Sequence, residues 1–164
     1  MATDPLGPLG TALTTAPLSE IVAGVGAAPV HTRWLEIDQA TIDRFADLTN
    51  DHNWLHVDPQ RAAQSPAGGT IAHGFLTLAL IPTMAYEVLP RVQEARMGMN
   101  YGLNKVRFVA PVPVGSRVRG AFTLLQAKTR EDGSRSELTY AITIEIEGSE
   151  RPALVAEWIR VAIF

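Results

Sequence analysis

The C-terminal half of the chain alternates apolar and polar side chains in four stretches, at residues 96–109, 117–128, 136–147 and 152–163. Turn-forming sequences separate them, namely Pro-Val-Pro-Val-Gly, Arg-Glu-Asp-Gly-Ser and Glu-Gly-Ser-Glu. Residues 32–37 show a shorter alternation nearer the N-terminus. Because period-two alternation between turns is typical of half-buried strands, the pattern predicts five antiparallel strands.

The N-terminal half carries three helical patterns, at residues 17–25, at 39–48 and after Pro59. The middle pattern is amphipathic, and Asp38 occupies the position where an N-cap is expected. Pro59 suits the first turn of a short helix, for which Asp58 is the expected cap. We therefore expect three short helices before the strand-rich half.

Residues 71–86 are apolar on nearly every side, which predicts a helix enclosed by other structure. Its most apolar part is far shorter than the roughly 20 residues that span a bilayer, so no membrane segment is expected. A long antiparallel sheet wrapped around this helix would bury both, which predicts an α+β fold. We expect one domain at residues 16–164, preceded by a poorly ordered tail at residues 1–15.

Composition narrows the possible functions. The formal net charge of -3 gives no broad attraction for nucleic acid phosphates. The absence of cysteine excludes disulfides, a thiolate nucleophile and cysteine-bound metals. The first residues lack the basic and apolar regions of a secretion signal, so a cytoplasmic location is expected.

Residues able to transfer protons gather in one polar stretch, residues 49–59. Asp51 and His56 within it are five positions apart, which on a continuous helix turns them about 140° from each other. A loop is therefore needed to bring both side chains to one water or substrate atom. Imidazole suits such a role because it takes and gives protons near neutrality.

This stretch resembles the signature of hydratase 2 and MaoC-like dehydratases, and within them the nodulation-protein-N-like subgroup. The matching positions are Phe45, Leu48, Thr49, Asp51, Asn53, Leu55, His56 and, further on, Ala62. Asn50 stands where the family usually has Gly, and Trp54 where it usually has Pro. A second family element, His-Gly at the start of the central helix, is matched by His73 and Gly74.

The resemblance implies a hot-dog fold, usually paired as a homodimer, and an (R)-specific enoyl-CoA hydratase, a lyase of fatty acid metabolism. Asp51 and His56 would share the water that adds to a trans-2-enoyl thioester, and their individual roles stay open. The Gly74 backbone N–H would hold the thioester oxygen, and Asn53 would position Asp51 or the substrate. Coenzyme A enters as part of the substrate, and no cofactor is expected.

Simpler roles exist for several of these residues. Asp51 would also suit a turn, and we interpret His73 as a packing residue at the helix start. His52 and His56 are four apart with Asp58 nearby, but the loop between them is a poor zinc site, so no metal is expected. Four basic residues could meet coenzyme A phosphates, although solubility of strand edges is the commoner reason for such charges; they are Lys105, Arg107, Arg117 and Arg119.

Two other functions stay open. A hot-dog thioesterase would aim an activated water at the carbonyl carbon instead of the β-carbon. A binding subunit without turnover would keep the fold and lose the chemistry, but the presence of both Asp51 and His56 weighs against it. Trp54 is a candidate for the wall of an acyl tunnel.

Overall fold

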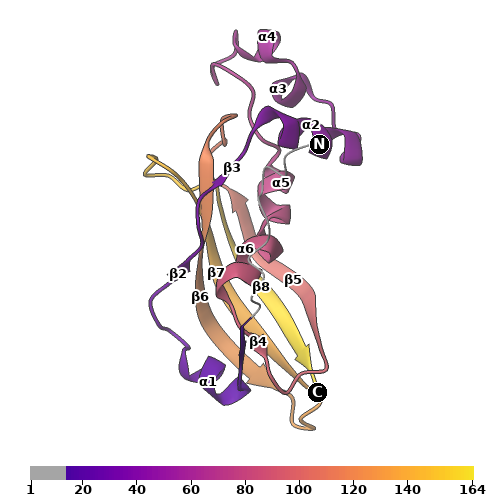
Figure 1. Ribbon diagram of the computed structural model, residues 1–164, viewed down its shortest axis with the longest axis vertical. Coiled ribbons are helices and arrows are strands. Elements are labelled where there is room, and N and C mark those ends of the chain that lie inside the picture. Colours follow the sequence, from indigo (N-terminus) through magenta and orange to yellow (C-terminus); the bar gives the residue numbers. More distant parts are fainter. Residues whose placement is uncertain (1–13) are drawn as a thin grey trace.

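The computed structural model describes residues 14–164 (Figure 1). Its sheet is built mainly from β5 (Met97–Phe108), β6 (Arg117–Thr129), β7 (Arg135–Ile146) and β8 (Leu154–Ile163). These strands lie in the order β6-β7-β8-β5, and all neighbours are antiparallel. Each one overlaps the stretch in which the alternating pattern predicted it, so that prediction is confirmed.

Strand β7 shows how the alternation becomes a core. Its side chains alternate between half-buried and buried along the whole strand. Ile142 and Ile144 on the buried face belong to one hydrophobic cluster with Met84 and Leu154. Burying each such aliphatic side chain stabilises the fold by about 1.5–3 kcal/mol, so this face holds the helices against the sheet.

The predicted strand at residues 32–37 is wrong in its detail. Two short strands, β2 (Val30–His31) and β3 (Leu35–Glu36), pair with β6 instead. Between them the Thr32 N–H donates to the Gly120 carbonyl oxygen at 3.0 Å, but the Gly120 N–H donates to the Thr32 hydroxyl, so a side chain replaces one backbone bond of the ladder. The main sheet of the described residues thus has six strands, and a separate parallel pair joins β1 (Thr15–Ala16) to β4 (Arg91–Val92).

The central helix is divided, contrary to the single helix expected at residues 71–86. α5 (Gly74–Ala79) ends next to Leu80, and α6 (Ile81–Val88) begins immediately afterwards. Pro82 explains the division because it has no N–H to donate to the preceding turn and its ring crowds that turn. The sheet curves around these two helices (Figure 1), which is the expected hot-dog arrangement.

The remaining helices are α1 (Leu18–Ala23), α2 (Gln39–Thr49), α3 (Trp54–Val57) and α4 (Pro59–Ala62). All three predicted helical patterns are confirmed. The Asp38 carboxylate accepts a hydrogen bond from the Thr41 N–H at 2.8 Å, and Asp58 caps α4 through the Arg61 N–H. Hydrogen bonds from Thr41, chiefly from its side chain, lower the pKa of Asp38.

Strand β5 forms one edge of the sheet, and its outer side has no pairing partner within residues 14–164. The pairing with β8 shifts register twice, between Asn100 and Gly102 and between Asn104 and Arg107. Lys105, in the second irregularity, has a φ of 53°, which is unusual for a residue with a Cβ. β5 therefore bends, and bulges of this kind redirect side chains near functional sites.

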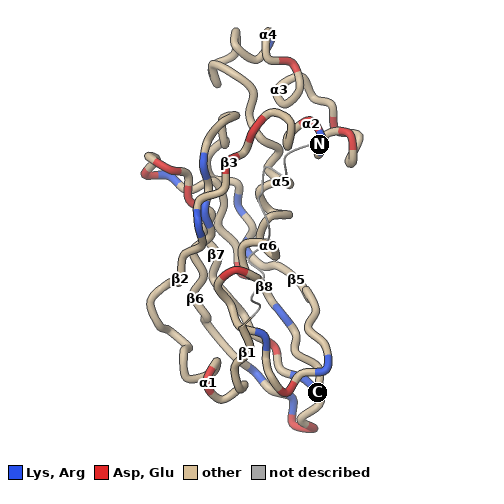
Figure 2. The backbone as a smooth tube through the Cα atoms, viewed as in Figure 1, with Lys and Arg blue, Asp and Glu red and all other residues tan. Residues whose placement is uncertain are grey.

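Charged residues are unevenly distributed (Figure 2). Asp and Glu lie around α2 and α3 and also in the turns between strands, whereas Lys and Arg lie mainly along the strands. Among the described residues, no helix has the length and apolar character needed to cross a membrane.

Candidate active site

The loop after α2 turns sharply at Asn50. This residue adopts the left-handed conformation, with φ 57° and ψ 29°, and closes the helix as its C-cap. The Asp51 N–H then donates to the Ala46 carbonyl oxygen at 3.1 Å. Because Gly and Asn are the residues that enter this conformation most readily, Asn50 can replace the family glycine without changing the turn.

His56 lies on α3 and is held by two hydrogen bonds from opposite sides. Its Nδ1 is 2.7 Å from the Ile71 carbonyl oxygen, and the Gln39 side chain donates to the His56 carbonyl oxygen at 2.8 Å. A carbonyl can only accept, so Nδ1 must carry the hydrogen. In the neutral ring the lone pair is then on Nε2, where it can accept a proton.

The loop brings Asp51 and His56 together. Each offers an oxygen or nitrogen atom, and these atoms lie within 4.8 Å of each other and of a nitrogen of His73. Two hydrogen bonds of about 2.8 Å that meet at one water place their outer atoms roughly 4.5 Å apart. The carboxylate and the imidazole thus lie at the separation that one bridging water spans.

His73, immediately before α5, is 2% exposed and lies directly behind the pair. Its ring stacks on the His56 ring at 3.7 Å with an angle of 28°, and Phe45 packs at 5.1 Å. Its Nε2–H donates to the Asp51 carbonyl oxygen at 2.9 Å. Its Nδ1 is buried without a hydrogen-bond partner among residues 14–164.

These three residues have the types of a metal site, but their geometry is poor for one. A ring nitrogen binds metal along a lone pair that lies in the ring plane. Because the His56 and His73 rings are stacked with planes only 28° apart, those lone pairs do not converge on one ion. His52 points elsewhere, with its Nε2 2.9 Å from the Asp47 carboxylate.

Gly74 is the first residue of α5, where backbone N–H groups have no partner within the helix. A Cβ built on Gly74 would come within 2.9 Å of the Phe108 ring. The glycine therefore permits both the close packing of Phe108 and the approach of another group to the start of the helix.

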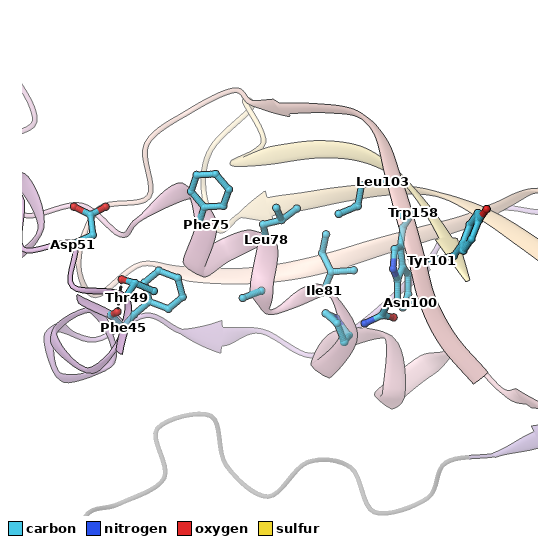
Figure 3. Close-up of a pocket in the computed structure, with 13 residues that line it drawn as sticks. Phe45, Thr49, Asp51, Phe75, Leu78, Ile81, Asn100, Tyr101, Leu103 and Trp158 are labelled. Carbon is cyan, nitrogen blue, oxygen red and sulfur yellow. Dashed lines mark hydrogen bonds between the residues drawn. The ribbon is translucent and has the colours of Figure 1, made fainter. Parts of the chain in front are cut away.

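Two cavities meet at Asp51. The larger, about 720 Å³ and here called the groove, runs from Asp51 along α5 and α6 to Trp158 and Tyr101 (Figure 3). The second cavity, about 390 Å³, also contains His56, His73 and Gly74 in its wall. Phe75 lines both, and it is 68% exposed. The expectation that residues 71–86 are fully enclosed is therefore wrong at Phe75, which stands between two openings.

Two predicted site residues lie outside this centre. Asn53 caps α3, where its side-chain oxygen accepts from the Leu55 N–H at 3.1 Å, and it lines neither cavity. Trp54 also lines neither cavity, because its ring packs beneath the Arg61 guanidinium at 4.4 Å. The tryptophan in the groove wall is Trp158.

Sequence reasoning missed Gln39 and Thr70. The Gln39 side chain bonds both the His56 carbonyl and the hydroxyl of Thr70, which is 2% exposed. This bridge ties the start of α2 to the His56 segment. Both residues are common polar types outside the motif, and only their buried contact reveals the role.

Comparison with known proteins agrees with the fold. The MaoC like domain model matches residues 20–145. Nodulation protein N of Rhizobium leguminosarum bv. viciae is 49% identical over 148 residues, covering 90% of this chain and 91% of the relative. The 3-hydroxyacyl-thioester dehydratase Z of Mycobacterium tuberculosis is 46% identical and covers 87% of this chain and 93% of its own.

Among solved structures, an (R)-hydratase from A. caviae involved in PHA biosynthesis superposes with a TM-score of 0.65 at 26% identity. It covers 84% of this chain and 96% of its own length. The fold and site thus define a hot-dog domain with a paired carboxylate and imidazole. The chain belongs to the MaoC-like dehydratase domain family.

Proposed function

We propose that the protein is an (R)-specific enoyl-CoA hydratase, which adds water to a trans-2-enoyl-CoA to give the (R)-3-hydroxyacyl-CoA. The observation that carries the proposal is the convergence of Asp51 and His56 within 4.8 Å, at the point where two cavities meet. The names of a relative, a 3-hydroxyacyl-thioester dehydratase, and of a structural neighbour, an (R)-hydratase, support the same type of reaction.

His56 acts as the base and then as the acid. Its Nε2 takes a proton from the bridging water while the water oxygen forms a bond to the β-carbon. The electron pair of the double bond moves towards the thioester oxygen, giving an enolate. The proton then passes from Nε2 to the α-carbon, so the elements of water are added and the imidazole returns to its neutral form.

Asp51 orients the same water. Its carboxylate accepts no hydrogen bond from the rest of residues 14–164, so both oxygens are available. Accepting the second hydrogen of the water would hold the oxygen towards the β-carbon. The dehydration reaction reverses these steps.

Gly74 and Asn53 have supporting roles in this proposal. The Gly74 N–H at the start of α5 donates to the thioester oxygen as negative charge develops, and loss of one such donor costs about 100- to 1000-fold in kcat. Asn53 keeps α3 in place through its cap, and so holds the segment that carries His56.

The groove is proposed to hold the acyl chain. Its wall is mainly apolar, with Leu78, Ile81 and Leu103 between the Asp51 end and Trp158 (Figure 3). The second cavity then receives the thioester and the pantetheine arm. A thioesterase would instead need the water beside the carbonyl carbon, and the assay below distinguishes the two reactions.

The test is hydration of crotonyl-CoA, followed as loss of the enoyl absorbance together with a chiral assay of the product. Wild-type protein is expected to give the (R) product. Asp51→Asn and His56→Ala should each lower kcat by about 100-fold or more, since acid and base groups contribute on that scale.

The matched control is His52→Gln, which changes another imidazole of the same loop that points to Asp47. Its kcat should stay within about twofold of wild type. Wild-type activity in Asp51→Asn or His56→Ala, or release of free coenzyme A in place of hydration, would contradict the proposal.

A further inference from the structure

His73 is in contact with both members of the acid/base pair, although it was expected only to pack at the helix start. Its ring is the middle one of three, between His56 at 3.7 Å and Phe45 at 5.1 Å. The Nδ1–H bond to Ile71 fixes the rotation of the His56 ring about its Cβ–Cγ bond, because turning the ring would break that bond. The stack holds the plane of the same ring, so the hydrogen bond and the stack together determine where Nε2 points.

His73 also fixes the peptide of Asp51. The Asp51 carbonyl accepts from His73 Nε2–H at 2.9 Å, and the Asp51 N–H is bonded to Ala46. With both of its backbone groups held, Asp51 presents its carboxylate from a rigid base even though the residue is exposed.

Packing alone does not account for an imidazole at this position. His73 Nδ1 is buried without a partner among the described residues, and an unsatisfied buried nitrogen is unfavourable. A phenyl ring would fill the same space without this cost. The Nε2–H bond to Asp51 is what the imidazole adds.

We propose that His73 is a positioning residue that holds Asp51 and His56 in the arrangement that shares one water. The inference rests on the proposed function, because the role it assigns belongs to that reaction. His73 also directly precedes Gly74, so the same segment that orients the acid/base pair also places the proposed donor to the thioester oxygen.

Two substitutions separate the ring from the hydrogen bond. His73→Phe keeps an aromatic ring for the stack but has no donor for Asp51. His73→Gln keeps a donor at a similar reach but has no ring. We expect His73→Phe to lower kcat by about 100-fold, the scale of a small misplacement of reacting groups, with KM within about twofold of wild type. His73→Gln should recover at least about tenfold of that loss, because a direct hydrogen bond fixes Asp51 again.

The melting temperature distinguishes a positioning role of His73 from a purely structural one. A phenyl ring fills the space of the imidazole and leaves no unpartnered Nδ1 behind, so His73→Phe should melt within a few degrees of wild type. Thr32→Val is the control: it removes a buried hydroxyl that is bonded to Gly120 and lines neither cavity, and it should lower the melting temperature while kcat is unchanged. Wild-type kcat in His73→Phe, failure of that variant to fold, or equal losses in Phe and Gln variants would overturn the proposal.

A measurement without substrate separates this inference from the proposed reaction. Backbone amide relaxation dispersion should show new exchange on the microsecond to millisecond scale at Asp51 in His73→Phe, which lacks the donor to the Asp51 carbonyl, but not at Asp51 in His73→Gln. If wild-type protein hydrates no enoyl thioester while these spectra behave as expected, the proposed function fails and the positioning role stands. Unchanged dispersion in His73→Phe would remove the positioning role.

Discussion

Asn50 shows how one backbone conformation decides which residues the catalytic loop accepts. With φ at 57°, the residue lies in the region where a Cβ crowds the backbone, and a β-branched side chain is the most unfavourable choice there. Glycine, which is usual in the family, adopts this conformation because it has no Cβ, and the asparagine found here adopts it because its short polar side chain tolerates it.

A pair of variants at this position measures the requirement. Asn50→Val should lower the free energy of unfolding by about 1–2 kcal/mol, whereas Asn50→Gly should change it by less than about 0.5 kcal/mol. Urea unfolding followed by circular dichroism gives both values. Equal destabilisation by the two substitutions would show that the asparagine side chain, rather than the turn conformation, matters.

At the residue scale, the motif residues could be predicted from the sequence, but the residues that hold them in place could not. The spacing of Asp51 and His56 predicted that a loop must bring them together, and they do converge. The contacts of His73, Gln39 and Thr70 join positions 17 to 31 residues apart. Such contacts depend on how α2, α3 and α5 pack, which no local pattern in the chain describes.

At the scale of elements, the alternating pattern predicted the four long strands because each has one buried face. It failed where side chains substitute for backbone, as at Thr32, and where one residue interrupts a uniform apolar run, as at Pro82. Pro82 was visible in the sequence. The apolar run on both sides of it nevertheless favoured a continuous helix, since both halves pack against the same sheet.

The α5 wall of the groove leads to a prediction about acyl chain length. Leu78→Trp adds volume halfway along the groove, and forcing such volume into a packed site costs about 1–3 kcal/mol. We expect kcat/KM for an enoyl-CoA of about 12 acyl carbons to fall by about tenfold or more. A tenfold loss corresponds to roughly 1.4 kcal/mol. For crotonyl-CoA the change should stay within about twofold.

The comparison uses the two thioesters in one spectrophotometric assay. Leu125→Trp, on β6 and outside both cavities, is the control and should alter neither value. Parallel losses for short and long substrates in Leu78→Trp would mean that the chain takes another path.

At the scale of the whole molecule, the open edge of β5 is the main feature that one chain leaves incomplete. Exposed apolar side chains accompany the unpaired backbone, with Met97 48% and Met99 42% exposed. Unpaired edges of this length usually associate or are covered. We therefore propose that two copies pair along β5 to form a homodimer.

Light scattering should give twice the chain mass of 17.7 kDa at micromolar concentration. Replacing both Met97 and Met99 by Lys should shift the protein towards monomer, because two charges would be buried against their counterparts. Leu125→Lys, an equally exposed apolar position on β6, should leave the mass unchanged. A wild-type monomer would rule out this arrangement.

Because the groove and the second cavity meet at Asp51, their arrangement bears on the configuration of the proposed product. A substrate with its acyl chain in the groove and its carrier arm in the second cavity would not bind in the reverse direction, because the phosphorylated arm would then lie against the apolar wall of the groove. Only one face of the planar double bond then faces the water that attacks it. The configuration of the new stereocentre would thus follow from the arrangement of the groove and the second cavity, without any residue that recognises the new hydroxyl.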